Sequence, residues 1–179
     1  MLEPLLMKMR PALHNIQPPL QVFGFRHAEP SFHKTKKKNN VEAGIKNEGS
    51  VKVFSIPLPT IIISSPYKRS LLTANEYANK IEYPLDQIVV DSRVSEFEAH
   101  HINPFLPMND GENNLNSPNR FDYVNARLEQ FLEELKNNEG VVYIFSHGVI
   151  LNRLAEYTTG KKLANRGRLV KYATPYQLL

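Results

Sequence analysis

The chain has 179 residues, of which 41% are hydrophobic and 22% are charged, values that are typical of one globular domain rather than two. Its 22 basic and 18 acidic residues give a formal net charge of +4, which suits an anionic ligand but is too small to indicate a nucleic-acid partner. Cysteine is absent, which excludes disulfides, thiolate metal sites and a cysteine nucleophile, and is consistent with a reducing compartment.

We expect a single domain over residues 1–179, with a folded core at about 20–175 and an irregular lead-in at 1–19 that contains four prolines. No apolar run approaches the ~20 residues of a membrane-spanning helix. The N-terminus lacks the basic stretch and apolar core of a signal peptide. These features predict a cytoplasmic protein with no membrane partner.

The first predicted strand, residues 20–26, is an apolar run that ends abruptly at Arg26 and His27. The polar stretch after it holds four lysines within residues 34–38, which we interpret as a solvated loop. A basic rim for an anionic substrate is one alternative. RNA binding is another, and it is unfavourable because no aromatic side chains alternate with the lysines. A short helix is predicted over residues 41–54.

The second predicted strand, residues 60–64, contains three consecutive isoleucines, which indicate burial on both faces, as in a parallel sheet. We expect a helix to follow at once and to run to about Lys80, with a serine as its N-cap and Pro66 at its first position. Three of its side chains are available for the core: Leu71, Leu72 and Tyr77. A third short strand is predicted over residues 87–91.

Residues 99–120 form a long insert rich in Asn and Pro, and loops of this length are uncommon unless they are functional or disordered. Its adjacent His100 and His101 raise the alternative of a metal site. Zinc sites draw their ligands from two spaced clusters, and the sequence offers no second cluster to complete this one. We therefore expect no metal.

The clearest predicted helix covers residues 121–137, where five apolar side chains fall on one face: Val124, Leu128, Phe131, Leu132 and Leu135. A buried strand at 141–145, a helix at 149–157 and a last strand at 169–172 complete the chain. Strands that alternate with helices indicate an α/β fold with three layers, in which helices flank a mostly parallel sheet.

Three of the predicted strands end near polar side chains of related kind. Arg26 and His27 end the first, Arg69 lies in the first turn of the helix after the second, and His147 follows strand 141–145. Ligands of open α/β sheets bind outside the carboxyl ends of the strands. Guanidinium groups and helix N-termini both favour phosphate oxygens. The sequence therefore predicts a site for a phosphoryl group at this edge.

Four segments, in this order, resemble the motifs of the histidine phosphatase superfamily, which includes phosphoglycerate mutases and acid phosphatases. They are Arg26-His27-Ala28-Glu29, Ser64-Ser65-Pro66-Tyr67-Lys68-Arg69-Ser70-Leu71-Leu72-Thr73-Ala74, Arg93-Val94-Ser95-Glu96-Phe97 and Ser146-His147-Gly148. The resemblance implies a phosphoglycerate mutase-like fold. It also implies a reaction without a cofactor, on a phosphorylated small molecule or a phosphoprotein.

The resemblance also implies a role for each site residue. His27 is the nucleophile that takes the phosphoryl group, and Glu96 gives a proton to the leaving oxygen. Arg26, Arg69 and His147 hold the phosphoryl oxygens, and His147 also belongs to the catalytic set. The chemistry agrees, because a neutral imidazole attacks phosphorus and two guanidinium groups neutralise the oxygens without a metal. The expected protein is a metal-independent phosphatase that acts through a phosphohistidine.

Ala28 stands where the family has Gly, and its methyl group could crowd the phosphate or alter a backbone N–H that faces it. This departure leaves open a phospho-ligand binding protein without turnover. A phosphomutase is a further alternative, although the chain is short for a phosphoglycerate mutase. Glu98 competes with Glu96 as the proton donor, and Asp110 or Glu112 would be the next candidates.

Overall fold

The protein is described by a computed structural model that covers residues 19–31, 43–96, 122–166 and 169–179. Its elements, in chain order, are β1 (Gln21–Arg26), β2 (Ile61–Ser64), α1 (Lys68–Lys80), the 3-10 helix η1 (Leu85–Gln87), β3 (Val89–Val90), the 3-10 helix η2 (Ser92–Val94), α2 (Asp122–Leu135), β4 (Val141–Ser146), α3 (Gly148–Thr159) and β5 (Pro175–Gln177). None of the helices in these residues is long and apolar enough to cross a membrane.

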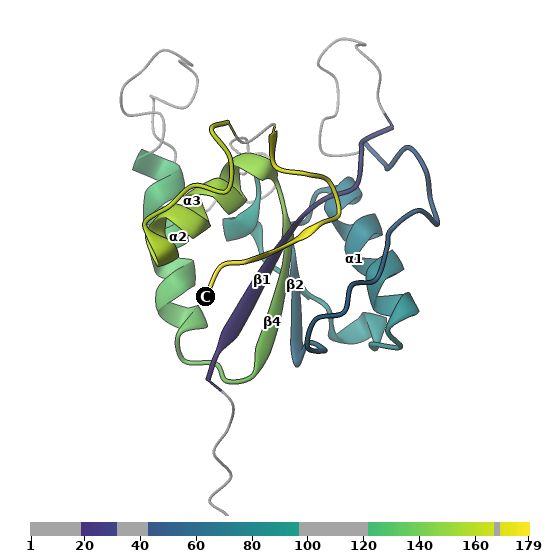
Figure 1. Cartoon of the computed structure of the whole chain (residues 1–179), viewed down its shortest axis with the longest axis horizontal. Helices are drawn as coiled ribbons and strands as arrows, with labels where there is room; N and C mark the ends of the chain where they lie inside the picture. Colours follow the sequence, from purple (N-terminus) through teal and green to yellow (C-terminus); the bar gives the residue numbers. More distant parts are fainter. Residues whose placement is uncertain (1–18, 32–42, 97–121, 167–168) are drawn as a thin grey trace, which may run out of the picture.

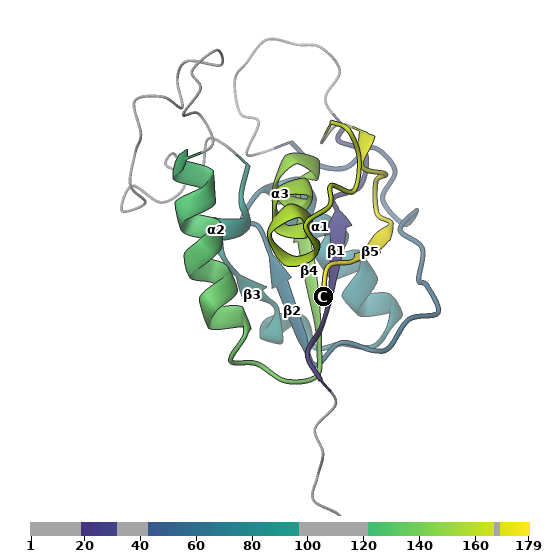
Figure 2. The same cartoon turned by 60° about the vertical axis from the view of Figure 1, so that its left-hand side comes forward.

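The five strands form one sheet in the order β3-β2-β4-β1-β5. β4 pairs in parallel with both β1 and β2, β2 pairs in parallel with β3, and only β5 runs antiparallel, against β1. Helix α1 covers one face of the sheet, and α2 and α3 cover the other (Figures 1 and 2). The predicted three-layer α/β fold with a mostly parallel sheet is thus confirmed.

Two hydrophobic clusters, one on each face of the sheet, form the core. Phe23 and Phe25 of β1 belong to the cluster under α1, whereas Val22 belongs to the cluster under α2 and α3. β2 divides in the same way, with Ile62 and Ile63 buried in opposite clusters. Successive side chains of a strand point to opposite faces, so the continuous apolar runs match strands covered on both sides. Gly24 lets Leu151 and Leu178 approach β1 closely.

The polar side of each helix faces solvent because the apolar residues recur with helical spacing. In α2, four of the five predicted core side chains are buried, and the fifth, Leu132, packs at the edge of the cluster. In α1, Tyr77 is buried, whereas Leu71 and Leu72 are only half-buried. Gly160 ends α3 in the left-handed conformation, which glycine adopts without strain.

The helix predicted over residues 41–54 is wrong for its described part, which contains no helix. Side chains of α1 satisfy the backbone of this segment instead. Glu76 accepts hydrogen bonds from the amides of Gly49 and Val51, and Lys80 donates to the carbonyls of the same two residues. Backbone groups outside helices and strands need other partners, and here the partners come from a neighbouring helix.

Two other element predictions need correction. Helix α1 begins at Lys68 with Tyr67 as its N-cap, so neither serine caps it. The hydroxyl of Ser65 bonds to His147 rather than serving as a helix cap. The last strand lies at Pro175–Gln177 and not at 169–172, where Tyr172 makes only an isolated bridge to Arg26. The lysine-rich stretch 34–38 and the insert 99–120 lie outside the described residues.

Candidate functional site

The predicted site residues lie at the carboxyl edge of the parallel strands, at the top of the sheet in Figure 1. His27 directly follows β1, and His147 follows β4 and is the N-cap of α3. Arg69 is the second residue of α1, and Glu96 comes shortly after η2. Parallel strands bring their carboxyl ends together, so segments far apart in sequence meet here.

Arg69 is the centre of this site, and its side chain is only 2% exposed. Its Nε donates to Nε2 of His27 at 3.0 Å. Its Nη2 donates to Oε2 of Glu96 at 2.6 Å and to Nδ1 of His147 at 3.1 Å. The guanidinium also lies over the ring of buried Tyr67, 4.6 Å from its centroid. One arginine thus contacts both histidines and the carboxylate that the sequence places in the site.

The hydrogen bonds of His27 define which of its ring nitrogens is free to react. Nδ1 lies 2.7 Å from the carbonyl oxygen of Ala28, which only accepts, so Nδ1 carries the proton. Nε2 then holds the lone pair that accepts from Arg69. Burial, together with the nearby charges of Arg69 and Arg26, lowers the pKa of His27 to about 3 against the opposing effect of the Ala28 carbonyl. His27 is therefore neutral at physiological pH, with Nε2 directed into the site.

His147 is fully buried and takes the other tautomer. Its Nδ1 accepts from Arg69, so the proton of the neutral ring lies on Nε2 and is donated to Oγ of Ser65 at 2.9 Å. Burial lowers the pKa of His147 well below its usual range, and the His27 and Arg69 groups add to this effect. The 3.5 Å contact between Nδ1 and Glu96 is therefore not an ion pair in this state.

Arg26, the remaining predicted phosphate ligand, lies beside the site but bonds to the C-terminal segment. Its Nη1 donates to the carbonyl of Val170 at 2.8 Å and its Nη2 to the hydroxyl of Tyr172 at 3.0 Å. The guanidinium also stacks on the Tyr172 ring, 3.9 Å from its centroid. Its charge still acts on the site, because it contributes to the low pKa of His27.

Ala28, which stands where the family motif has Gly, contacts α1 through both its side chain and its amide. Its side chain is buried in the hydrophobic cluster under α1. Its amide donates to Oγ1 of Thr73 at 2.8 Å, and that hydroxyl donates to the carbonyl of Arg69 at 2.7 Å. The alanine amide thus links the strand end to the first turns of α1 through a threonine side chain.

Sequence reasoning missed Arg127 of α2, which holds the segment that carries Glu96. Its Nη2 donates to the carbonyls of Ser95 at 2.6 Å and Glu96 at 3.0 Å. A signal was available, because Arg127 falls between Val124 and Phe131 on the apolar face of the predicted helix. Ser65, Tyr67 and Thr73 lie in the second motif, but only the fold reveals their contacts.

Among the residues that the structure describes, His, Asp and Glu side chains do not gather in any group of three or more that could hold a metal ion. The alternative metal pair His100 and His101 lies outside these residues. So do the alternative proton donors Glu98, Asp110 and Glu112.

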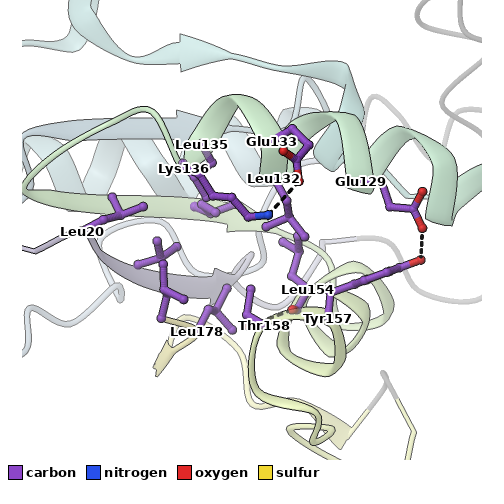
Figure 3. A pocket seen from close by; sticks show the side chains of 13 residues that line it. Leu20, Glu129, Leu132, Glu133, Leu135, Lys136, Leu154, Tyr157, Thr158 and Leu178 are labelled. Atoms are coloured by element: carbon purple, nitrogen blue, oxygen red, sulfur yellow. Dashed lines mark hydrogen bonds and ion pairs between the residues drawn. The ribbon is translucent and has the colours of Figure 1, made fainter.

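A separate pocket of about 260 Å³ opens at the opposite end of the sheet, between α2, α3 and the start of β1 (Figure 3). Its wall is mainly aliphatic, and two polar pairs border it, Glu133 with Lys136 and Tyr157 with Glu129. Neither histidine of the site lines this pocket.

The low pKa of His27 predicts a loss of stability in acid. A group that binds protons less readily when folded favours unfolding as the pH falls from its unfolded pKa toward its folded one. For His27 this window runs from 6.5 down to about 3. The free energy of unfolding should fall by about 2 kcal/mol between pH 7 and pH 5 through this residue alone. Urea unfolding at the two pH values measures it.

The matched variant is His27→Asn, which removes the titrating group. Between pH 7 and pH 5, its free energy of unfolding should fall less than that of the wild type, by about 2 kcal/mol. His147→Asn should likewise make the fall in the free energy of unfolding smaller than in the wild type. Equal losses in the wild type and both variants would contradict the neutral, buried state of the two rings.

The family model of the histidine phosphatase superfamily (branch 1) matches residues 53–174. The match covers more than half of the chain, and the protein belongs to this superfamily. It begins after His27, so the place of His27 in the site rests on the strand end and on its contacts. The chain has no significant sequence match among curated proteins.

Several solved structures share the fold. A candidate alpha-ribazole-5'-P phosphatase from Escherichia coli has a TM-score of 0.60 at 10% identity and covers 89% of this chain and 90% of its own. YhfR from Bacillus stearothermophilus has a TM-score of 0.56 at 18% identity, with coverage of 88% and 90%. A mycobacterial glucosyl-3-phosphoglycerate phosphatase has a TM-score of 0.53 at 14% identity, with coverage of 88% and 88%.

Proposed function

We propose that the protein is a metal-independent phosphatase that hydrolyses a phosphomonoester through a phosphohistidine at His27. Membership of the histidine phosphatase superfamily and the phosphatases among proteins of the same fold support phosphatase or phosphomutase chemistry in general. The observation that carries the specific proposal is the direction of the His27 lone pair. Nε2 faces Arg69, while Nδ1 is bound to the backbone of the next residue.

In the proposed reaction, Nε2 of His27 attacks phosphorus and forms the N–P bond as the bond from phosphorus to the ester oxygen breaks. Once the substrate phosphate has displaced it from Arg69, Glu96 takes a proton from solvent and gives it to the leaving alkoxide. Water then attacks the phosphohistidine, the Glu96 carboxylate takes its proton, and the N–P bond breaks to release inorganic phosphate and restore the imidazole. Arg69 neutralises the oxygens at each transition state, the main task in phosphoryl transfer.

Glu96 occupies the position at Arg69 that an incoming anion would take. Its Oε2 is 2.6 Å from Nη2 of Arg69, a charge-assisted distance that a phosphoryl oxygen also adopts. We infer that the substrate phosphate replaces the carboxylate there and frees Glu96 to face the leaving oxygen. Arg26 would complete the set of cations from the other side, with Tyr172 keeping its guanidinium in place.

The packing of Ala28 supports turnover over binding alone. The binding-only alternative depends on a methyl group that crowds the phosphate. That methyl group is buried in the hydrophobic cluster under α1, and the neighbouring amide is bound to Thr73. Hydrolysis of an aryl phosphate by the purified chain tests this choice, and phosphate transfer to an added alcohol would favour a mutase.

Orthovanadate is expected to inhibit the enzyme at concentrations far below the substrate KM. Vanadate adopts the five-coordinate geometry of the transition state, and such mimics bind much more tightly than substrates. The mycobacterial phosphatase of the same fold has also been solved in a complex with VO3. Steady-state kinetics with an aryl phosphate as substrate give the inhibition constant of vanadate directly.

A chelator such as EDTA should leave the rate unchanged, because the arginines supply the positive charge that a metal would otherwise provide. Loss of activity with EDTA that a divalent ion restores would overturn the metal-free mechanism. It would also make the adjacent His100 and His101 candidates for a metal site again.

A further inference from the structure

We propose that Arg127 is a positioning residue that holds the Glu96 carboxyl where it gives its proton to the leaving group. This inference rests on the phosphatase function proposed above. Arg127 belongs to α2, more than thirty positions along the chain from Ser95, and bonds to the backbone of the Glu96 segment. Two features of Arg127 support this role: its hydrogen bonds to the Glu96 segment and its burial.

Arg127 donates hydrogen bonds to three carbonyl oxygens around Glu96. Nη2 donates to Ser95 at 2.6 Å and to Glu96 itself at 3.0 Å, and Nη1 donates to Ser92 at 3.4 Å. Charge-assisted bonds in a planar fork fix direction as well as distance. The peptide planes on both sides of the Glu96 α-carbon are therefore held from one point, which sets the direction in which its side chain leaves the backbone.

Burial keeps the hydrogen bonds between Arg127 and these carbonyls in place. Arg127 is only 2% exposed, so water cannot replace it at the carbonyls that it holds. A second contact supports the same segment, because Oγ of Ser146 donates to the carbonyl of Val94 at 2.5 Å. A buried carbonyl that loses its donor carries a free-energy penalty and tends to turn toward water. Removal of the Arg127 guanidinium should thus turn Glu96 away from the site.

Arg127 bonds to the backbone around Glu96, and its charge reaches His147 only as a minor contribution to the low pKa of that ring. Its loss should therefore affect proton donation much more than the attack on phosphorus. Proton donation is needed for an alkoxide leaving group and hardly at all for a nitrophenolate, which leaves unaided. Arg127→Met should therefore lower kcat for alkyl phosphates by roughly 10- to 100-fold, the usual effect of a misplaced catalytic group. The rate with nitrophenyl phosphate and both KM values should change by less than about threefold.

Arg93→Met is the matched control. Arg93 lies in η2, just before the Glu96 segment, and it bonds to Asp91 and to Glu134 at 2.7 Å rather than to the carbonyls of Ser95 and Glu96. Its loss should leave the ratio of alkyl to aryl rates unchanged. Arg127→Lys should recover part of the ratio, because its ammonium group still donates to one carbonyl.

A double-mutant cycle separates positioning from general damage. If Arg127 acts through Glu96, then R127M should change the ratio of alkyl to aryl rates in the wild type and not in the E96Q background. An equal loss with both substrate classes in R127M, or an unchanged ratio, would overturn the proposal.

A second measurement does not need turnover. In a protein with isotopically labelled glutamate carboxyls, the resonance of Glu96 is the one that E96Q removes. R127M should shift this resonance toward that of a solvent-exposed carboxylate, and R93M should not. If no phosphomonoester is hydrolysed, the proposed function fails, and this shift still decides whether Arg127 holds Glu96. An unchanged resonance overturns the inference even where activity is normal.

Discussion

His27→Ala is expected to reduce turnover by on the order of 10³-fold or more while the protein stays folded, because the variant has no group that can form the covalent intermediate. The structure gives a specific reason for choosing this ring over His147. The lone pair of His27 lies on Nε2 and faces Arg69. The lone pair of His147 lies on Nδ1 of a fully buried ring, where Glu96 also lies 3.5 Å away. Rates with an aryl phosphate measure the loss.

The variant removes a buried ring and the Nε2 atom that accepts from Nε of Arg69, so some loss of stability is expected. Circular dichroism and thermal unfolding show whether the fold persists, and His27→Asn is a second variant that keeps a polar side chain. Retention of more than about a tenth of the wild-type rate by either folded variant is incompatible with a nucleophilic His27.

A chemical readout complements the rates. Incubation with a phosphate donor and a rapid quench should label the wild type with a phosphoryl group that is lost in acid and kept in base, as expected for phosphohistidine. The His27 variants should take no label. A phosphoryl label at another residue would assign the role of nucleophile to that residue instead of His27. Arg69 would then remain a phosphate-binding group only.

The strands and helices were predictable where burial decides them. β1, β2 and β4 are covered on both faces, and α2 on one, so their apolar residues recur with the spacing of the element. The helix prediction for residues 43–54 was wrong because backbone groups of this segment form hydrogen bonds with Glu76 and Lys80, which belong to a helix later in the chain. Such pairing between distant segments leaves no local pattern.

The candidate site, too, was predictable only in part. His27, Arg69 and His147 could be placed together because they stand at strand ends or in the first turn of a helix, and parallel strands share one edge. The side-chain directions depend on packing. Arg26 turns toward Val170 and Tyr172, whose segment was expected to be a strand and instead lies across the end of β1. Arg127 was missed, because its place on the apolar face of a predicted helix says nothing about which segment it bonds to.

Glu96→Gln is expected to slow hydrolysis of alkyl phosphates by roughly 10²- to 10⁴-fold, the usual contribution of a positioned proton donor. Glutamine keeps the size of the side chain and a carbonyl oxygen for Arg69, but it has no proton to give an alkoxide. Nitrophenyl phosphate should be slowed far less, because its leaving group departs without a proton. Paired assays on the two substrate classes measure the ratio.

Loss of the carboxylate also removes the negative charge that now occupies Arg69, so substrate binding should not weaken in this variant and KM should stay equal or fall. This separates an acid from a group that merely binds substrate, whose removal raises KM. Glu98→Gln is the neighbouring control and should change neither rate. If Glu98→Gln shows the leaving-group dependence instead, the proton donor lies two residues further along the chain. If neither variant shows it, Asp110 and Glu112 become the candidates, and the 2.6 Å contact of Glu96 with Arg69 has a structural role.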